Sequence, residues 1–243
     1  MTATSRVHRS INSRVRQNMN IFKAIFQSSL GKKYIMGLTG LALFGFVIGH
    51  MVGNLQIFLG QEKLNAYGAF LKSMPKLLWV ARIGLLACVG LHIWAAVQLV
   101  KENRAARPSR YEVQETNGAS FASRTMIWSG LIVFAFIVYH LFDFTITPDY
   151  TGHDAKGRHD VYKMVILGFS NPLSSLFYLV ANGLLCIHLS HGVKSLFQSL
   201  GLSTGQFRGW FNGLAVGMAW VIFIGNTSIP LAVLLGFGKE VLK

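Results

Sequence analysis

Five long apolar segments constrain this chain most, because few folds in water can accommodate them. The segments span residues 35–59, 77–100, 126–147, 173–199 and 210–237. A bilayer core about 30 Å thick is crossed by a helix of about 20 apolar residues. With 52% hydrophobic and only 13% charged residues, the chain is also more apolar than the average soluble domain. The sequence therefore predicts an all-α integral membrane protein with five transmembrane helices.

The polar stretches between these segments are too short for a second folded domain. The longest run from Lys101 to Arg124 and from Pro148 to Asn171. We therefore expect a basic arm at 1–34, a five-helix membrane domain at 35–238 and a short outer tail at 239–243.

The net charge of +14 is distributed as in a membrane protein, so we do not expect nucleic acid as a partner. Of the 23 Lys and Arg residues, fourteen fall in the arm and in the second and fourth connections, against nine on the other side. Positive charge accumulates on the cytoplasmic side of membrane proteins. We expect a cytoplasmic N-terminus and, after five spans, an outer C-terminus.

The basic arm carries apolar residues at helical spacing. Val15, Met19, Phe22 and Phe26 recur between basic residues, and the arm has no acidic residue through Lys33. This pattern predicts an interfacial amphipathic helix that lies on the anionic inner membrane surface. An Arg-rich transit peptide is the alternative interpretation.

Histidines inside the apolar segments are the main candidates for chemistry. Ionisable residues at membrane depth are costly, and by default they mark a functional site. Five of the eight histidines fall within the predicted spans: His50, His92, His140, His188 and His191.

Four of these histidines fall into two layers of depth. His50 and His140 lie 15 and 14 residues into helices that run outward, which puts them about 21–23 Å above the cytoplasmic edge. His92 and His188 lie 15 residues into inward helices, about 8 Å from the same edge. The layers are thus about 14 Å apart, and each receives one histidine from each of two helices.

Two stacked histidine pairs in a helical bundle predict two haem b groups. Neutral imidazole is a common axial ligand of haem iron. We assign His50 and His140 to an outer haem, and His92 and His188 to an inner one. His191, one turn from His188, is the alternative inner ligand. Interhelical hydrogen bonding is the alternative role for any single histidine.

A repeated pattern supports the outer pair. The sequence [Ser/Thr]-Gly-x9-His ends once at His50 and again at His140, and its hydroxyl residues are Thr39 and Ser129. A glycine at the second position would let a flat porphyrin approach the backbone. Close packing of two helices is the other reason for small residues there.

Further residues are candidates for haem propionates and for quinone. The haem-contact candidates are Thr39, Arg82, Lys101, Arg124, Ser129 and Lys194. Cations at helix ends also snorkel to the interface, which is the alternative for most of them. Quinone reduction needs protons beside an apolar cleft. The quinone candidates on the outer side are Asn54, Glu62 and Asp143, with Asp143 preferred; each is alternatively a hydrated helix-end residue.

Four segments centred on these histidines resemble the single-polypeptide, di-haem cytochrome b anchor of succinate dehydrogenases and menaquinol:fumarate reductases. They read GLTGLALFGFVIGHMVGNLQIF, RIGLLACVGLHIWAAVQL, SGLIVFAFIVYHLFDF and IHLSHGVKSLFQSLG. In that family a His-x3-Gly pattern marks the fourth-helix ligand, and His188 with Gly192 fits it. Where some fumarate reductases have a glutamate linked to proton transfer, two residues before this ligand, this chain has Cys186, which puts such a path in doubt.

The resemblance implies a location and partners. It places the chain in the bacterial cytoplasmic membrane, among lipid and quinone (menaquinone), below a flavoprotein and an iron-sulfur subunit on the cytoplasmic side. FAD and iron-sulfur clusters are expected only in those partners, because this chain has neither a Cys-rich cluster motif nor a dinucleotide fingerprint. The direction of the reaction and a higher oligomer of the complex are left open.

Two other functions fit the same histidines. One is a haem b anchor of a hydrogenase, formate dehydrogenase or nitrate reductase. The other is a proton-coupled transporter, which would carry no haem.

Overall fold

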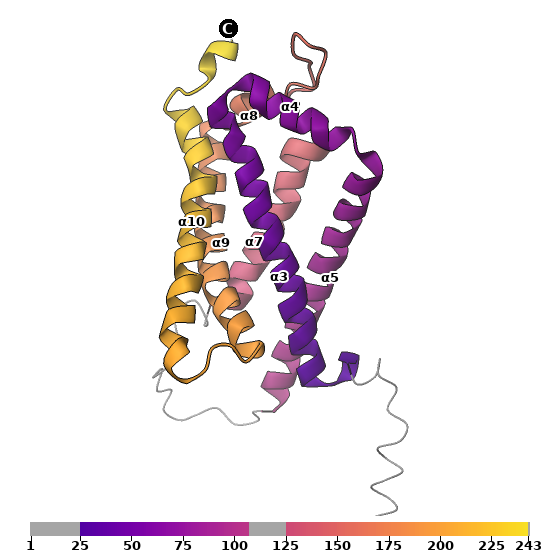
Figure 1. Cartoon of the computed structure of the whole chain (residues 1–243), viewed down its shortest axis with the longest axis vertical. Helices are drawn as coiled ribbons and strands as arrows, with labels where there is room; N and C mark the ends of the chain where they lie inside the picture. Colours follow the sequence, from indigo (N-terminus) through magenta and orange to yellow (C-terminus); the bar gives the residue numbers. More distant parts are fainter. Residues whose placement is uncertain (1–24, 107–124, 243) are drawn as a thin grey trace, which may run out of the picture.

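The structure is a computed structural model that describes residues 25–106 and 125–242. Its described part holds five helices long and apolar enough to cross a membrane, which confirms the predicted all-α class (Figure 1). They are α3 (Ser29–Asn54) with η1 (Leu55–Leu59), α5 (Pro75–Ala105), α7 (Met126–Leu141) with the π-helical η2 (Phe142–Ile146), α9 (Pro172–Ser199), and η3 (Gly205–Phe207) with α10 (Arg208–Leu234). A last turn, η4, covers Lys239–Leu242. The predicted arm helix falls mainly on residues 1–24, outside the described residues.

Capping residues set where several helices begin. Asn171 accepts hydrogen bonds from the backbone N–H groups of Leu173 and Ser174, and Pro172 occupies the first position of α9. Ser28 accepts from the N–H of Gly31, so α3 begins at Ser29. The first span therefore includes six residues that we had assigned to the arm, because a capped helix continues through a polar first turn.

The helices form two antiparallel hairpins joined by α10. Helix α5 packs along α3, and α7 packs along α9. Helix α3 also contacts α9 and α10, so it connects the hairpins (Figure 1). Apolar side chains from these helices are buried together between α3, α9 and α10: Phe44, Met51, Val193, Ala215 and Ile222. The outer faces of α5 and α7 leave large apolar side chains exposed, as expected of surfaces that meet lipid.

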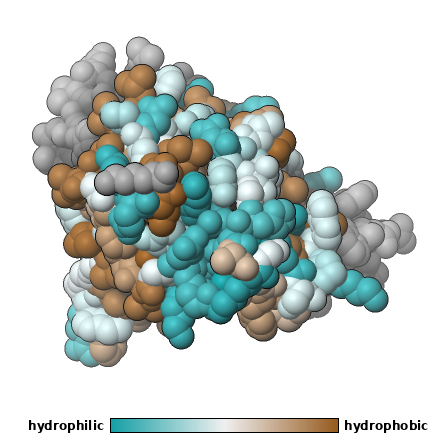
Figure 2. Space-filling view, turned by 90° about the horizontal axis from the view of Figure 1, so that it is seen from above, coloured by the Kyte–Doolittle hydropathy of each residue, from teal (hydrophilic) through white to brown (hydrophobic). Residues whose placement is uncertain are grey.

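Two short helices cap the end of the bundle where the C-terminus lies. They are α4 (Gln61–Lys72) and α8 (Val161–Ser170), and they pack against each other. Seen from above, hydrophilic residues gather on this end (Figure 2). Neither helix was predicted, because we interpreted both connections as polar loops.

Asn65 joins the two cap helices. Its side chain is fully buried and donates to Asp160 (2.9 Å) and Asp154 (3.2 Å), while it accepts from the backbone N–H of Tyr162 (2.9 Å). Asp160 in turn accepts from the N–H of Lys163 and caps α8. The loop that carries Asp154 and Asp160 is therefore an ordered part of the cap.

Replacing Asn65 with leucine is expected to destabilise the cap. The change leaves the buried N–H of Tyr162 without its partner and removes one donor each from Asp160 and Asp154, and an unpartnered buried group costs about 1–3 kcal/mol. Hydrogen exchange of the α8 amides should report a loss of about 1–3 kcal/mol in opening free energy. Ser73→Ala is the control, because the Ser73 hydroxyl is exposed and bonds only the Phe70 carbonyl. Unchanged exchange in Asn65→Leu would contradict this role.

Candidate functional site

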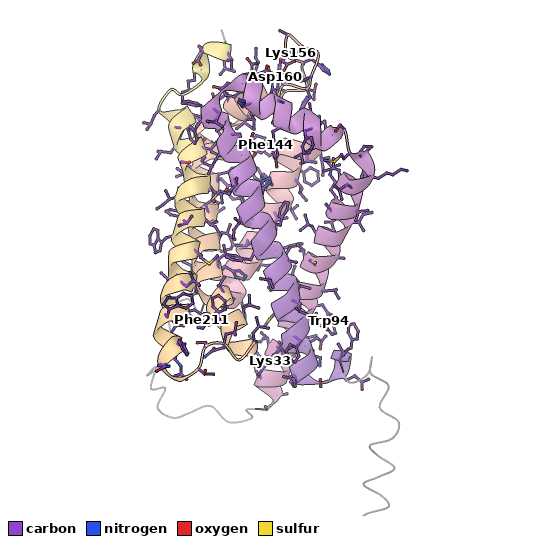
Figure 3. All side chains as sticks on the ribbon, viewed as in Figure 1. Lys33, Trp94, Phe144, Lys156, Asp160 and Phe211 are labelled. Atoms are coloured by element: carbon purple, nitrogen blue, oxygen red, sulfur yellow. The ribbon has the colours of Figure 1, made fainter. Side chains whose placement is uncertain are left out.

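The outer histidines face each other across the two hairpins. His50 on α3 and His140 on α7 have ring centroids 5.6 Å apart and lie nearly perpendicular, at 87°. Phe46 stacks on His50, and Phe136 and Phe144 lie against His140. Figure 3 labels Phe144 below the cap, near Asp160. The pair therefore has aromatic neighbours and lies in the half of the bundle nearer the cap.

The inner histidines also come from different hairpins. His92 on α5 lies within electrostatic reach of His188 on α9, and His188 lies within reach of His191. The remaining candidate, His191, is half-buried and is influenced by the charge of Lys194. Depth and neighbours thus associate His188, rather than His191, with His92.

The helices that carry each facing pair do not pack on one another. Contacts between α3 and α7, and between α5 and α9, are marginal or absent, whereas α3 packs closely on α5 and α7 on α9. The facing imidazoles are therefore presented across the interface between hairpins and are not buried in a tight helix contact.

His92 carries its proton on Nδ1, as judged from its partners. Nδ1 lies 3.1 Å from the carbonyl oxygen of Met36 and 3.3 Å from Oγ1 of Thr39. The Thr39 hydroxyl already donates to the carbonyl of Ile35 at 2.6 Å. Both neighbours of Nδ1 are thus acceptors, so Nδ1 must be the donor. The lone pair of Nε2 is left available.

His188 is held in the same way by the second hairpin. Its Nδ1 lies 3.3 Å from Oγ of Ser129, and that hydroxyl donates to the carbonyl of Met126 at 3.2 Å. With the Ser129 hydrogen on that carbonyl, Ser129 accepts from Nδ1, and Nε2 again keeps its lone pair.

His140 is the third histidine with this arrangement. Its Nδ1 lies 3.2 Å from the phenol oxygen of Tyr178, and Tyr178 donates its hydrogen to Asp143 at 2.8 Å. Because the phenol hydrogen is committed to the carboxylate, the phenol oxygen accepts from Nδ1. Sequence analysis missed Tyr178; the only signal was a hydroxyl-bearing aromatic at membrane depth, which usually needs a partner.

The repeated [Ser/Thr]-Gly pairs contact the inner histidines of the neighbouring helices. A Cβ on Gly40 would lie 3.2 Å from Cε1 of His92, and one on Gly130 would lie 3.3 Å from Cε1 of His188. The structure thus gives Thr39 and Ser129 an imidazole as partner, where we had expected a porphyrin or its propionates. From the spacing alone, we related each [Ser/Thr]-Gly pair to the histidine that ends its own pattern. In the structure, each pair instead packs against a histidine of a neighbouring helix.

The paired histidines among the described residues could serve as axial ligands of haem iron, but not as the whole ligand set of a bare metal ion. Among them, no group of three or more His, Cys, Asp or Glu side chains is placed to hold a metal ion. Two facing imidazoles are too few for a bare ion. They suffice as axial ligands of a metal that brings its own equatorial donors, as haem iron does.

Two of the cationic candidates, Arg82 and Lys101, lie on the surface. Arg82 is exposed and its guanidinium lies over the Trp79 ring at 5.2 Å, so its charge is not enclosed by apolar residues. Lys101 is exposed, and Arg124 lies outside the described residues. A cation that sequence analysis missed is Lys32, which is buried and paired with Glu102.

Glu62 does not fit a quinone site. Its carboxylate pairs with Arg158 (2.7 Å) and Lys156 (2.8 Å) at the cap end of the molecule. Hydrogen bonds from Arg158 and then Lys156 lower the pKa of Glu62 to about 2, so it stays ionised near neutral pH and has no proton to give. Figure 3 labels Lys156 at this end. Asn54, the other weak candidate, donates to the backbone carbonyl of His50 at 2.9 Å.

The Glu62 ion pairs predict an acid-sensitive cap. The folded-state pKa is about 2 and the unfolded value is about 4.3. The stabilisation is therefore complete above the unfolded pKa and is lost as the pH falls through the folded one. Thermal unfolding in detergent should separate wild type from Glu62→Gln at pH 5, and the difference should vanish near pH 2. A difference that grows on acidification would contradict the assignment.

Comparison of the chain with protein-family models, with curated proteins and with solved structures gives no match. The structure itself is that of an all-α protein with five helices of membrane-spanning length and composition. Within its described residues, His50 and His140 face one another across the two hairpins, and His92 lies within electrostatic reach of His188.

Proposed function

We propose that the chain is the membrane-anchor cytochrome b subunit of a succinate:quinone oxidoreductase. It would carry electrons through two b haems between an iron-sulfur subunit and membrane quinone. The observation that carries this proposal is the shared state of His92, His140 and His188. Each has an acceptor at Nδ1, and each therefore offers the lone pair of Nε2.

This state is typical of metal ligands. Ligating histidines almost always donate their other ring N–H to a carbonyl, carboxylate or similar acceptor, which fixes the tautomer and the ring orientation. Histidines that only join helices have no need of a common tautomer. The marginal contact between the helices of each pair also favours a flat group between the imidazoles over direct packing.

In the proposed role, each haem supplies one-electron chemistry and the chain supplies its setting. His50 with His140 and His92 with His188 hold the axial positions. Two haem layers about 14 Å apart would divide electron transfer across the membrane into short steps. We infer that the inner layer faces the iron-sulfur subunit and that quinone reacts on the outer side.

The identity of the enzyme rests on the family resemblance, and purification tests it. The complex, isolated in mild detergent through a tag on this chain, should contain a flavoprotein, and succinate should reduce its visible b bands. Molybdenum or nickel in the preparation would instead indicate the anchor of a formate dehydrogenase, nitrate reductase or hydrogenase. A colourless chain without such partners would favour the transporter.

A further inference from the structure

The outer layer contains a hydrogen-bonded chain that ends in a carboxylate. From His140 it runs through the phenol of Tyr178 to Asp143, with steps of 3.2 and 2.8 Å. Tyr178 is only 4% exposed and is enclosed by Phe136, Phe144 and Phe169. A phenol in such a setting responds strongly to a charge at its hydroxyl, because little water screens it.

A π-helical turn positions the carboxylate. Helix α7 ends at Leu141 and continues as η2, Phe142–Ile146, which contains Asp143. Such turns are rare and often occur at functional sites. Here the turn carries the residue that binds the Tyr178 hydroxyl, three positions after His140.

The inner layer has no equivalent carboxylate in the part of the chain that the structure describes. The acceptors at Nδ1 of His92 and His188 are the hydroxyls of Thr39 and Ser129 and the Met36 carbonyl. Those hydroxyls donate onward to neutral helix carbonyls. The two layers therefore differ in charge. The hydrogen-bonded chain from His140 ends at a carboxylate, whereas those from His92 and His188 end at neutral groups.

We propose that Asp143, acting through Tyr178, is a positioning residue that makes His140 a stronger donor and lowers the reduction potential of the outer haem relative to the inner one. The inference rests on the proposed function. A carboxylate behind a ligating imidazole raises its basicity, which favours the more oxidised state of the metal. Asp143 thereby acts as an electrostatic tuning residue, a different role from the quinone contact that we expected of it.

Redox titration of the purified complex, followed by visible spectra, tests this tuning. Dithionite supplies the electron and ferricyanide removes it, so no quinone turnover is involved. In Asp143→Asn and in Tyr178→Phe, the outer component should become about tenfold easier to reduce, a shift of about 59 mV for one electron. The inner component should keep its wild-type potential.

Tyr139→Phe is the matched control. Tyr139 lies beside Tyr178, but its hydroxyl is 3.3 Å from Ser174 and is not part of the hydrogen-bonded chain to His140. It should leave both potentials unchanged. Phenylalanine keeps the ring of Tyr178 and asparagine keeps the shape of Asp143, so both variants should retain two haems.

Unchanged potentials in Asp143→Asn or Tyr178→Phe would overturn the inference, as would equal shifts of both components. Loss of quinone reduction with unchanged potentials would also overturn it, in favour of a quinone contact. If the proposed function itself were wrong, wild-type protein would show no b-type bands at all. That result is distinct from the failures of the tuning proposal given above.

Discussion

Replacing His188 with alanine is expected to remove one of the two proposed haems, whereas replacing His191 with alanine leaves both. His188 is held at Nδ1 by Ser129 and lies within reach of His92. His191 is one turn away, half-buried and beside Lys194. Loss of the Nε2 donor leaves the inner haem with one axial ligand on the protein.

Haem content per chain measures this directly. For His188→Ala it should fall from about two to about one, with the outer spectral component retained. His191→Ala is the matched control, since it removes an imidazole from the same helix. The opposite outcome, with His191→Ala losing a haem and His188→Ala keeping both, would refute the choice of ligand.

Enlarging Gly40 or Gly130 should have nearly the same effect without touching a ligand. A Cβ at Gly40 already lies 3.2 Å from the His92 ring, so the branched end of leucine would need the space of that ring. Overpacking of this kind costs typically about 1–3 kcal/mol and shifts side chains. Gly40→Leu and Gly130→Leu should each displace an inner histidine from its hydroxyl partner and deplete the inner haem.

Ala42→Leu provides the comparison on the same helix, because Ala42 is exposed. It should retain both haems. If Gly40→Leu also retained both haems at wild-type levels, the contact between Gly40 and His92 would not be what positions the His92 imidazole.

The spans and the proximity of His50 to His140 were predictable from sequence. Hydropathy identifies the apolar segments, and the fixed rise of a helix converts residue number into depth. The structure accordingly has five long apolar helices, and His50 lies beside His140. Both inferences need only properties of single helices.

Other features depend on how helices rotate and pack, which spacing does not specify. Arg82 was a candidate for haem contact, but the structure leaves it exposed, over the Trp79 ring. The partners of Thr39 and Ser129 lie on neighbouring helices. Tyr178 reaches Asp143 only because a π-helical turn redirects the end of α7.

The cap was missed for a different reason. Helices α4 and α8 are 12 and 10 residues long and lie in connections with several polar residues. Short helices of this kind gain most of their stability from tertiary packing. Their partner contacts through Asn65 span more than 90 residues of sequence, from α4 to Asp160 and Tyr162.

The central claim is that two histidine pairs hold two b haems, and a reduced-minus-oxidised visible spectrum with haem quantification tests it most directly. The purified complex should show b-type bands and about two haems for each copy of this chain. Absence of a b-type band, or wild-type haem content after His50, His92, His140 and His188 are all replaced by alanine, would contradict the account.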